Sequence, residues 1–200
     1  MLKGFLILII FSTVSVANET QFIRDAYFKS YKHQSNKNYK EAIKALSLLY
    51  KKYPKGYTLN LRMAYLYYLS KEYNKAIIYY KKASKIIPSS NEAKLGLTKV
   101  YLASKKYKQA QTLAYAMLKT DYYSFYGNLY AIQALVAQNK NREALRIINK
   151  MLAVFPTNIS YLEELAMLYK KTNNNYLNDI YETLYILDPS NRLLNSVKRD

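Results

Sequence analysis

The chain has 200 residues, with 24 tyrosines but no cysteine or tryptophan, and its formal net charge is +18 at pH 7. Half of the residues are hydrophobic, which is enough for a folded core and excludes a disordered chain. Four glycines and four prolines are too few for the many turns of an all-β fold, and the lack of cysteine excludes disulfides and cysteine-ligated metal sites.

The first residues, MLKGFLILIIFSTVSVA, have the three parts of a secretory signal peptide. Lys3 gives a basic start, about a dozen mostly apolar residues follow, and Ser15 and Ala17 supply the small residues of a cleavage site. A transmembrane helix would need about 20 apolar residues, whereas polar residues begin at Asn18. We therefore expect residues 1–17 to be a signal peptide that is cleaved after Ala17, and the protein to be exported and periplasmic, or loosely attached to the envelope. The alternative is an N-terminal anchor that is kept.

Beyond residue 22 the chain repeats itself with a period of 34 residues. Apolar residues recur at three- and four-residue spacings, as in LNLRMAYLYYL and AIIYYKKASKII, and this pattern indicates amphipathic helices. An alanine recurs early in each second helix, where a small side chain lets two helices approach closely, and a proline 12 positions later ends that helix in three of four copies. The alanines are Ala42, Ala76, Ala110 and Ala144, and the closing positions hold Pro54, Pro88, Tyr122 and Pro156.

The period and its alanine and proline positions resemble the tetratricopeptide (TPR) repeat. The second copy, with MAYLYY, EYNKA and IIP, is the best match, whereas no tryptophan opens any first helix. The resemblance implies an all-α fold, a right-handed superhelical solenoid of about five helix-turn-helix repeats, over residues 18–189. We expect the repeats at about residues 23–56, 57–90, 91–124, 125–158 and 159–189, followed by a short capping helix or tail at 190–200.

No motif indicates catalysis. His33, the one histidine, lies where the first repeat turns, and the acidic pairs Glu163–Glu164 and Asp179–Glu182 fit charge balance on a lysine-rich surface. The sequence contains no HExxH, no GxSxG and no phosphate-binding glycine loop. It therefore predicts a protein that is not an enzyme, with no catalytic residue, no cofactor and no metal.

In TPR proteins the first helices of successive repeats line a concave groove that holds a peptide or a partner helix. A carboxylate clamp of the kind found in some TPR domains is not expected, because its asparagine positions hold Tyr31, Tyr65 and Lys99. Tyrosine suits a groove because its ring is large and rigid and its hydroxyl can bond to a ligand or to water. The groove positions that the resemblance transfers to this chain are Tyr27, Tyr31, Gln34, Leu61, Tyr65, Tyr68, Lys99, Tyr126 and Gln133. Core positions are expected instead for Tyr67, Tyr79, Tyr80 and Tyr101.

Two functional classes remain open. The first is a non-enzymatic protein–protein interaction scaffold of the bacterial cell envelope, with a protein or peptide partner in the tyrosine-rich groove. The second is a basic TPR-like module that binds an anionic polymer (polysaccharide, lipid headgroups or nucleic acid), because a strong positive charge attracts anionic partners. Its lysines would lie on the second helices, at Lys75, Lys81, Lys82 and Lys85. The signal peptide disfavours nucleic acid, and we prefer the scaffold.

Overall fold

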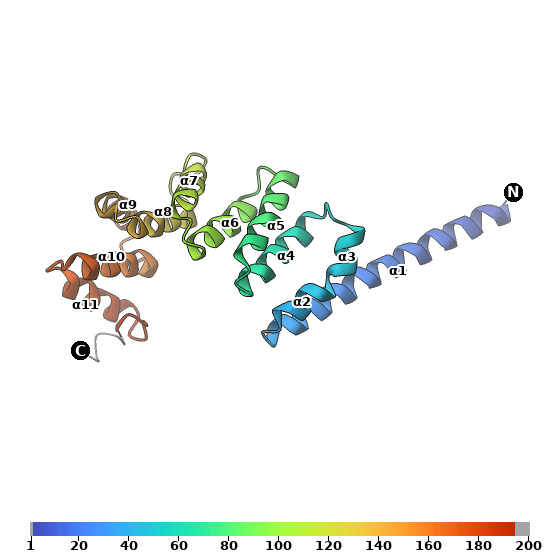
Figure 1. Cartoon of the computed structure of the whole chain (residues 1–200), viewed down its shortest axis with the longest axis horizontal. Coiled ribbons are helices and arrows are strands. Elements are labelled where there is room, and N and C mark those ends of the chain that lie inside the picture. The colour runs from blue at the N-terminus through green and yellow to red at the C-terminus, as the bar shows by residue number, and fades with distance from the viewer. Residues whose placement is uncertain (1, 195–200) are drawn as a thin grey trace. The chain divides into compact units, whose positions relative to one another are not determined.

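The computed structural model describes the backbone of residues 2–194 and the side chains of residues 17–194. Within that part of the chain every regular element is a helix (Figure 1). The expected signal peptide falls almost wholly outside the described side chains, and its cleavage stays a prediction. Among the residues with described side chains, no helix is both long and apolar enough to cross a membrane.

The first of two compact units covers residues 1–96. Its helices pair in chain order, since α1 packs on α2, α2 on α4, and α4 on α5. The second helix of the first repeat is interrupted at Leu46, whose amide bonds to the carbonyl of Ile43. The helices are α1 (Leu2–Ser35), α2 (Tyr39–Ala45), α3 (Ser47–Lys52), α4 (Tyr57–Leu69), α5 (Tyr73–Ile86) and the start of α6 (Asn91–Ala103).

The second unit covers residues 97–200. Here α7 packs on α8, α8 on α9, α9 on α10, and α10 on α11, while α8 also contacts α10. The helices that follow α6 are α7 (Tyr107–Leu118), α8 (Phe125–Ala137), α9 (Asn141–Val154), α10 (Ile159–Thr172) and α11 (Leu177–Leu187). Five helical hairpins in tandem confirm the expected all-α repeat fold.

Each hairpin turns through the same backbone conformation. One residue per turn has a positive φ, and these residues recur every 34 positions at Lys37, Lys71, Lys105, Asn139 and Asn173. The amide of the next residue bonds to a carbonyl five positions earlier, as when Asn38 donates to His33 at 2.8 Å and Lys140 donates to Leu135 at 2.9 Å. This bond is the mark of a Schellman motif, which satisfies the last carbonyls of the first helix.

The repeated small residues lie in the core. Ala42, Ala76, Ala110 and Ala144 are completely buried, as the spacing of the repeats predicted. In the first unit, Ala42 belongs to a core cluster with Leu46, Leu59 and Leu66. In the second unit, Ala144 belongs to a cluster with Ile132, Ile148 and Tyr161. The core of each unit therefore contains the small residue that recurs every 34 positions.

The tyrosines expected in the core lie there. Tyr80 and Tyr101 are buried, and Tyr67 and Tyr79 pack against the first core cluster with their rings stacked at 5.2 Å. A Cβ atom at Gly96 would lie 2.2 Å from the Tyr80 ring, so glycine is what allows that ring to fill the space.

Two buried asparagines hold the turns between repeats. Asn60 donates from Nδ2 to the carbonyls of Pro54 and Gly56 at 2.9 and 2.8 Å. Asn128, 68 positions later, donates in the same way to Tyr122 and Ser124 at 3.0 and 2.9 Å. The backbone turn is thus the same whether proline or tyrosine occupies the closing position.

The turn without proline has an additional support. Lys150 donates from Nζ to Asn128 Oδ1 at 2.6 Å and lies 3.9 Å from the centroid of the Tyr122 ring. The equivalent oxygen of Asn60 is buried and has no partner. Lysine and the aromatic ring together therefore stabilise the turn at which the sequence lacks its proline.

Residues after Pro189 pack on the last repeat. Leu194 is buried with Leu162 and Leu184, and Leu193 lies against the same cluster. The rest of the expected cap, residues 195–200, lies outside the described residues.

Candidate partner-binding face

In the first unit, tyrosines from the first helices form a partly exposed surface. Tyr31 on α1 is 54% exposed and Tyr65 on α4 is 38% exposed. Tyr27, one turn before Tyr31, is half-buried, and the centroids of the two rings are 6.3 Å apart. Gln34 is also half-buried, and it lies near the end of the same helix.

Arg62 on α4 joins these residues, although the repeat pattern does not mark its position. Its side chain is only 7% exposed. The guanidinium donates from Nη1 to the side-chain oxygen of Gln34 and from Nη2 to Ser30 Oγ at 3.1 Å. Its central carbon lies 3.9 Å from the centroid of the Tyr31 ring, while its Nε is buried and has no hydrogen-bond partner. Arg62 therefore links α4 to α1 beneath the exposed rings.

The positive charge of Arg62 is not balanced by an acid. None of the ion pairs formed by the described residues includes it. Burial lowers the pKa of Arg62, and the neighbouring Tyr31, Tyr65 and Tyr27 act in the opposite direction. An arginine stays protonated under all ordinary conditions. A permanent charge is thus buried among neutral groups.

The other two groove positions of α4 differ from each other. Tyr68 is half-buried, with its ring 6.2 Å from that of Tyr73, and burial, Tyr73 and Tyr65 raise its pKa. Leu61 is 7% exposed, no more than Arg62 beside it, and its place in the groove stays a prediction.

In the second unit, an acid occupies the corresponding face. Glu164 on α10 is 5% exposed and accepts a hydrogen bond from Nε2 of Gln133 on α8 at 2.6 Å. Burial raises the pKa of Glu164 to about 7; the bond from Gln133 opposes this shift and Glu163 adds to it. Gln133, an expected groove position, therefore bonds to a buried acid, so the expectation that Glu164 belongs to a charged surface is wrong.

The two remaining groove positions lie on α6 and α8 of the second unit. Lys99 is exposed on α6. Tyr126 is 49% exposed on α8, and its ring lies 5.0 Å from Phe125 and 5.8 Å from Tyr130. Of the nine expected groove residues, the described contacts link Tyr27 with Tyr31, and Arg62 links Tyr31 with Gln34.

The lysines expected on the second helices are partly engaged by tyrosine. Lys82 donates to the hydroxyl of Tyr50 at 2.8 Å and lies 5.0 Å from the centroid of the Tyr79 ring. Lys75 bonds to Glu72 at 2.6 Å and lies 5.3 Å from the Tyr67 ring. Lys81 and Lys85 are exposed. Part of the positive charge on these helices thus stabilises the fold.

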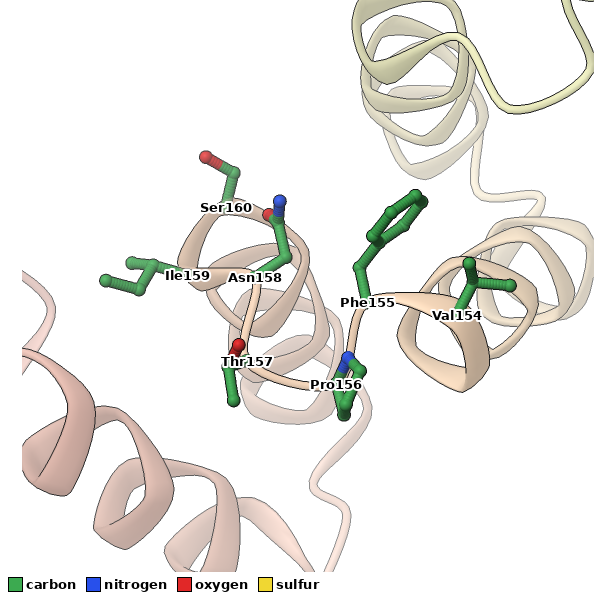
Figure 2. Close-up of a pocket in the computed structure, with 7 residues that line it drawn as sticks. All are labelled: Val154, Phe155, Pro156, Thr157, Asn158, Ile159 and Ser160. Atoms are coloured by element: carbon green, nitrogen blue, oxygen red, sulfur yellow. The ribbon is translucent and has the colours of Figure 1, made fainter.

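The pocket in Figure 2 lies at a surface turn. It is lined by seven consecutive residues, Val154–Ser160, from the end of α9 to the start of α10. The side chains of Phe155 and Ile159 point to different sides, so they do not converge on a ligand (Figure 2). Among the described residues, no three His, Asp or Glu side chains gather where they could hold a metal ion.

Comparisons with known proteins identify the fold. No protein-family model matches the sequence, and no curated protein does. Solved structures of MamA, a TPR-like all-helical protein, are similar in fold to most of this chain. MamA from Desulfovibrio magneticus RS-1 is 16% identical, with 86% of this chain and 97% of that chain covered and a TM-score of 0.72. A crystal structure of MamA protein is 14% identical, with 85% of this chain and 93% of that chain covered and a TM-score of 0.68. MamA MSR-1 is 18% identical, with 84% of this chain and 98% of that chain covered and a TM-score of 0.64. The chain therefore has a TPR-like fold.

Proposed function

We propose that this protein is a non-enzymatic scaffold of the bacterial cell envelope that binds a peptide or a helix of a partner protein. The binding surface is the tyrosine face of α1 and α4, formed by Tyr27, Tyr31, Tyr65 and Tyr68 beside Arg62. The observation that carries the proposal is the exposure of Tyr31 and Tyr65 beside a buried, unbalanced guanidinium. Tyrosine and arginine are enriched at protein interfaces, where they dominate the binding energy.

The repeat fold supports the same function. Tandem helical hairpins offer an extended surface whose side chains change from repeat to repeat while the core stays constant. The TPR-like fold shared with MamA supplies such a surface, although the identities of 14–18% leave the partner open. The export of the protein is part of the proposal, and it rests on the basic, apolar and small-residue parts of the N-terminal sequence.

Two variants test the proposed surface. Changing Tyr65 and Tyr68 to alanine together removes two rings from α4, while changing Lys81, Lys82 and Lys85 to alanine removes charge from α5. Loss of an aromatic anchor often costs about 2 kcal/mol or more, roughly thirtyfold in affinity. We expect crosslinking in native cells and mass spectrometry to recover one protein partner with the lysine variant but not with the tyrosine variant. Unchanged circular dichroism verifies that both variants fold.

A basic surface that binds an anionic polymer is the second candidate function. The net charge of +18 and the exposed Lys81 and Lys85 favour it. Such binding would weaken with salt, because charge attraction between exposed groups is screened. If the lysine variant loses its partner and the tyrosine variant keeps it, the tyrosine face is not the binding surface and this second function replaces the first.

A further inference from the structure

We infer that Arg62 is the anchor for a carboxylate side chain, Asp or Glu, of the partner that binds the tyrosine face. This inference rests on the proposed function, because it names the chemistry that the partner must bring to that face. The starting observation is that the positive charge of Arg62 has only neutral neighbours within the first unit. Arg62 is buried on α4 with its Nε unpaired, and its neighbours are the neutral side chains Ser30, Gln34 and Tyr31.

An unbalanced buried charge is costly, so its presence requires a reason. A charge removed from water loses its hydration, and proteins usually compensate by pairing it with an opposite charge. Hydrogen bonds to Ser30 and Gln34 use two of the five N–H groups of Arg62. The other N–H groups of Arg62 can therefore donate to a further acceptor. A negatively charged acceptor would also balance the positive charge of the guanidinium.

The shape of the guanidinium favours a carboxylate. Its planar N–H groups form a fork that matches the two oxygens of a carboxylate and binds them with two parallel hydrogen bonds. The rings of Tyr31 and Tyr65 would exclude water from such a pair, and exclusion of water strengthens the electrostatic attraction. Their exposed surfaces would contact apolar residues beside the acid. The expected partner segment thus carries an Asp or Glu with apolar neighbours.

The surroundings of Arg62 favour a partner's acid over one from this chain. The electrostatic neighbours of Arg62 are Tyr31, Tyr65 and Tyr27. The chain has 31 basic residues but only 13 acidic ones, so its surface attracts acidic segments.

The first test measures carboxylate binding at Arg62 directly. Sodium acetate is titrated into the full-length, ¹⁵N-labelled protein, and the Nε–H resonance of Arg62 is followed by NMR. The matched variants are Arg62→Gln and Arg142→Gln, which remove the same charge from the buried position and from an exposed position on α9. Sodium chloride at equal ionic strength controls for screening.

We expect acetate to shift the Arg62 resonance saturably in the wild-type protein and in Arg142→Gln. The ring resonances of Tyr31 should shift with it, and both responses should be absent from Arg62→Gln. A response to chloride equal to that to acetate, or no saturable response, would overturn the inference. A response to inorganic phosphate that is much stronger than the response to acetate would also overturn it, because it would identify a phosphorylated polymer as the ligand.

The second test uses the captured partner and separates this inference from the proposed function. A hydrogen bond to a charged group contributes about 1.5–3 kcal/mol, so Arg62→Gln should weaken binding of the partner by roughly tenfold or more. Arg142→Gln should leave binding unchanged. Equal binding by wild type and Arg62→Gln, with loss in the Tyr65 and Tyr68 double variant, would refute the role of Arg62 and retain the scaffold function. If the wild type captures no protein, the scaffold function fails, and the acetate titration alone decides for or against a carboxylate site.

Discussion

The two units of this protein carry opposite charges at the same position of the repeat. Arg62 in the first unit and Glu164 in the second are three periods of 34 residues apart. Both are buried, and each contacts the residue 31 positions earlier, Tyr31 in one case and Gln133 in the other. Between them in the chain, the same position holds Gly96 and Tyr130. The missing side chain of Gly96 leaves space for the ring of Tyr80.

The different residues at this position show that the fold does not require one residue type there, whereas it does require a small residue at the alanine positions. The alanines of the second helices are buried in every copy that carries them, so the packing fixes their size. The position of Arg62 and Glu164 accepts a cation, an acid or glycine without a change in the repeat. Buried charges that the fold does not need are expected at functional sites. We call the buried alanines of the second helices the shared frame. Substitutions in both units can test whether stability depends on this frame in the same way in each unit, and whether the charges at Arg62 and Glu164 are dispensable for it.

The largest effect is expected at Glu164. Burial raises the pKa of Glu164 to about 7, whereas an unfolded glutamate has a pKa of about 4.3. Between these values the folded state binds more protons, so stability falls as the pH rises through this window. Glu164→Gln keeps the bond to Gln133 but removes the charge. It should be more stable than wild type by on the order of 3 kcal/mol at pH 8, with little difference at pH 4.

Urea denaturation at both pH values measures this effect. Glu182→Gln removes an exposed carboxylate from α11 and should follow the wild type at each pH. Equal stabilisation by Glu164→Gln at pH 4 and pH 8 would show that the carboxylate does not become charged in the folded protein over this range.

The shared frame is tested by enlarging one alanine in each unit. Ala76→Leu and Ala144→Leu add bulk where two helices meet, and each should cost about 1–3 kcal/mol because the core has no space for it. Ala153→Leu makes the same change at an exposed position of α9 and should stay within about 0.5 kcal/mol. Thermal unfolding measures all three. If only one of the two buried sites is sensitive, the two units do not share the same packing frame.

The turn that lacks proline should depend on Lys150. Lys150→Ala would leave the buried Oδ1 of Asn128 without its partner and remove the contact with the Tyr122 ring. We expect a loss of about 1–2 kcal/mol in the free energy of unfolding. The double variant Lys150→Ala with Tyr122→Pro should recover part of that loss, because proline restores the turn of the other repeats. Equal stability of wild type and Lys150→Ala would exclude this role of the lysine.

The smallest effects are expected on α5. Lys82→Ala removes a hydrogen bond to Tyr50 and the contact with the Tyr79 ring, at a cost of about 0.5–1 kcal/mol. Lys81→Ala removes the same charge from an exposed neighbour and should change stability by less than about 0.5 kcal/mol. The two variants differ in contacts and not in net charge. Identical melting temperatures would show that the tyrosine contacts of Lys82 contribute nothing to stability.

The sequence predicts the parts of the fold that repeat. The spacing of Ala42, Ala76 and Ala144 predicts buried positions, because packing imposes the same small volume on each copy. The same logic places Tyr80 and Tyr101 in the core. Both predictions rest on a constraint that recurs every 34 residues and is therefore visible in one sequence.

The charged position of the first helices could not be predicted in this way. It holds Arg62, Gly96 and Glu164 in different repeats, so no period marks it. A weaker signal was present, since Arg62 is the one charged residue in the apolar stretch LNLRMAYLYYL. Leu61 was assigned to the groove from the resemblance to TPR proteins, and it is as buried as Arg62.

The most direct test of the proposed binding surface is photo-crosslinking at single positions in living cells. Benzoylphenylalanine is introduced in place of Tyr31, where it preserves an aromatic ring on α1, and separately in place of Lys81 on α5. If the tyrosine face binds the partner, irradiation will join one protein to position 31 and none to position 81. Crosslinks from position 81 without any from position 31 would contradict the proposal and would assign partner binding to the second helices.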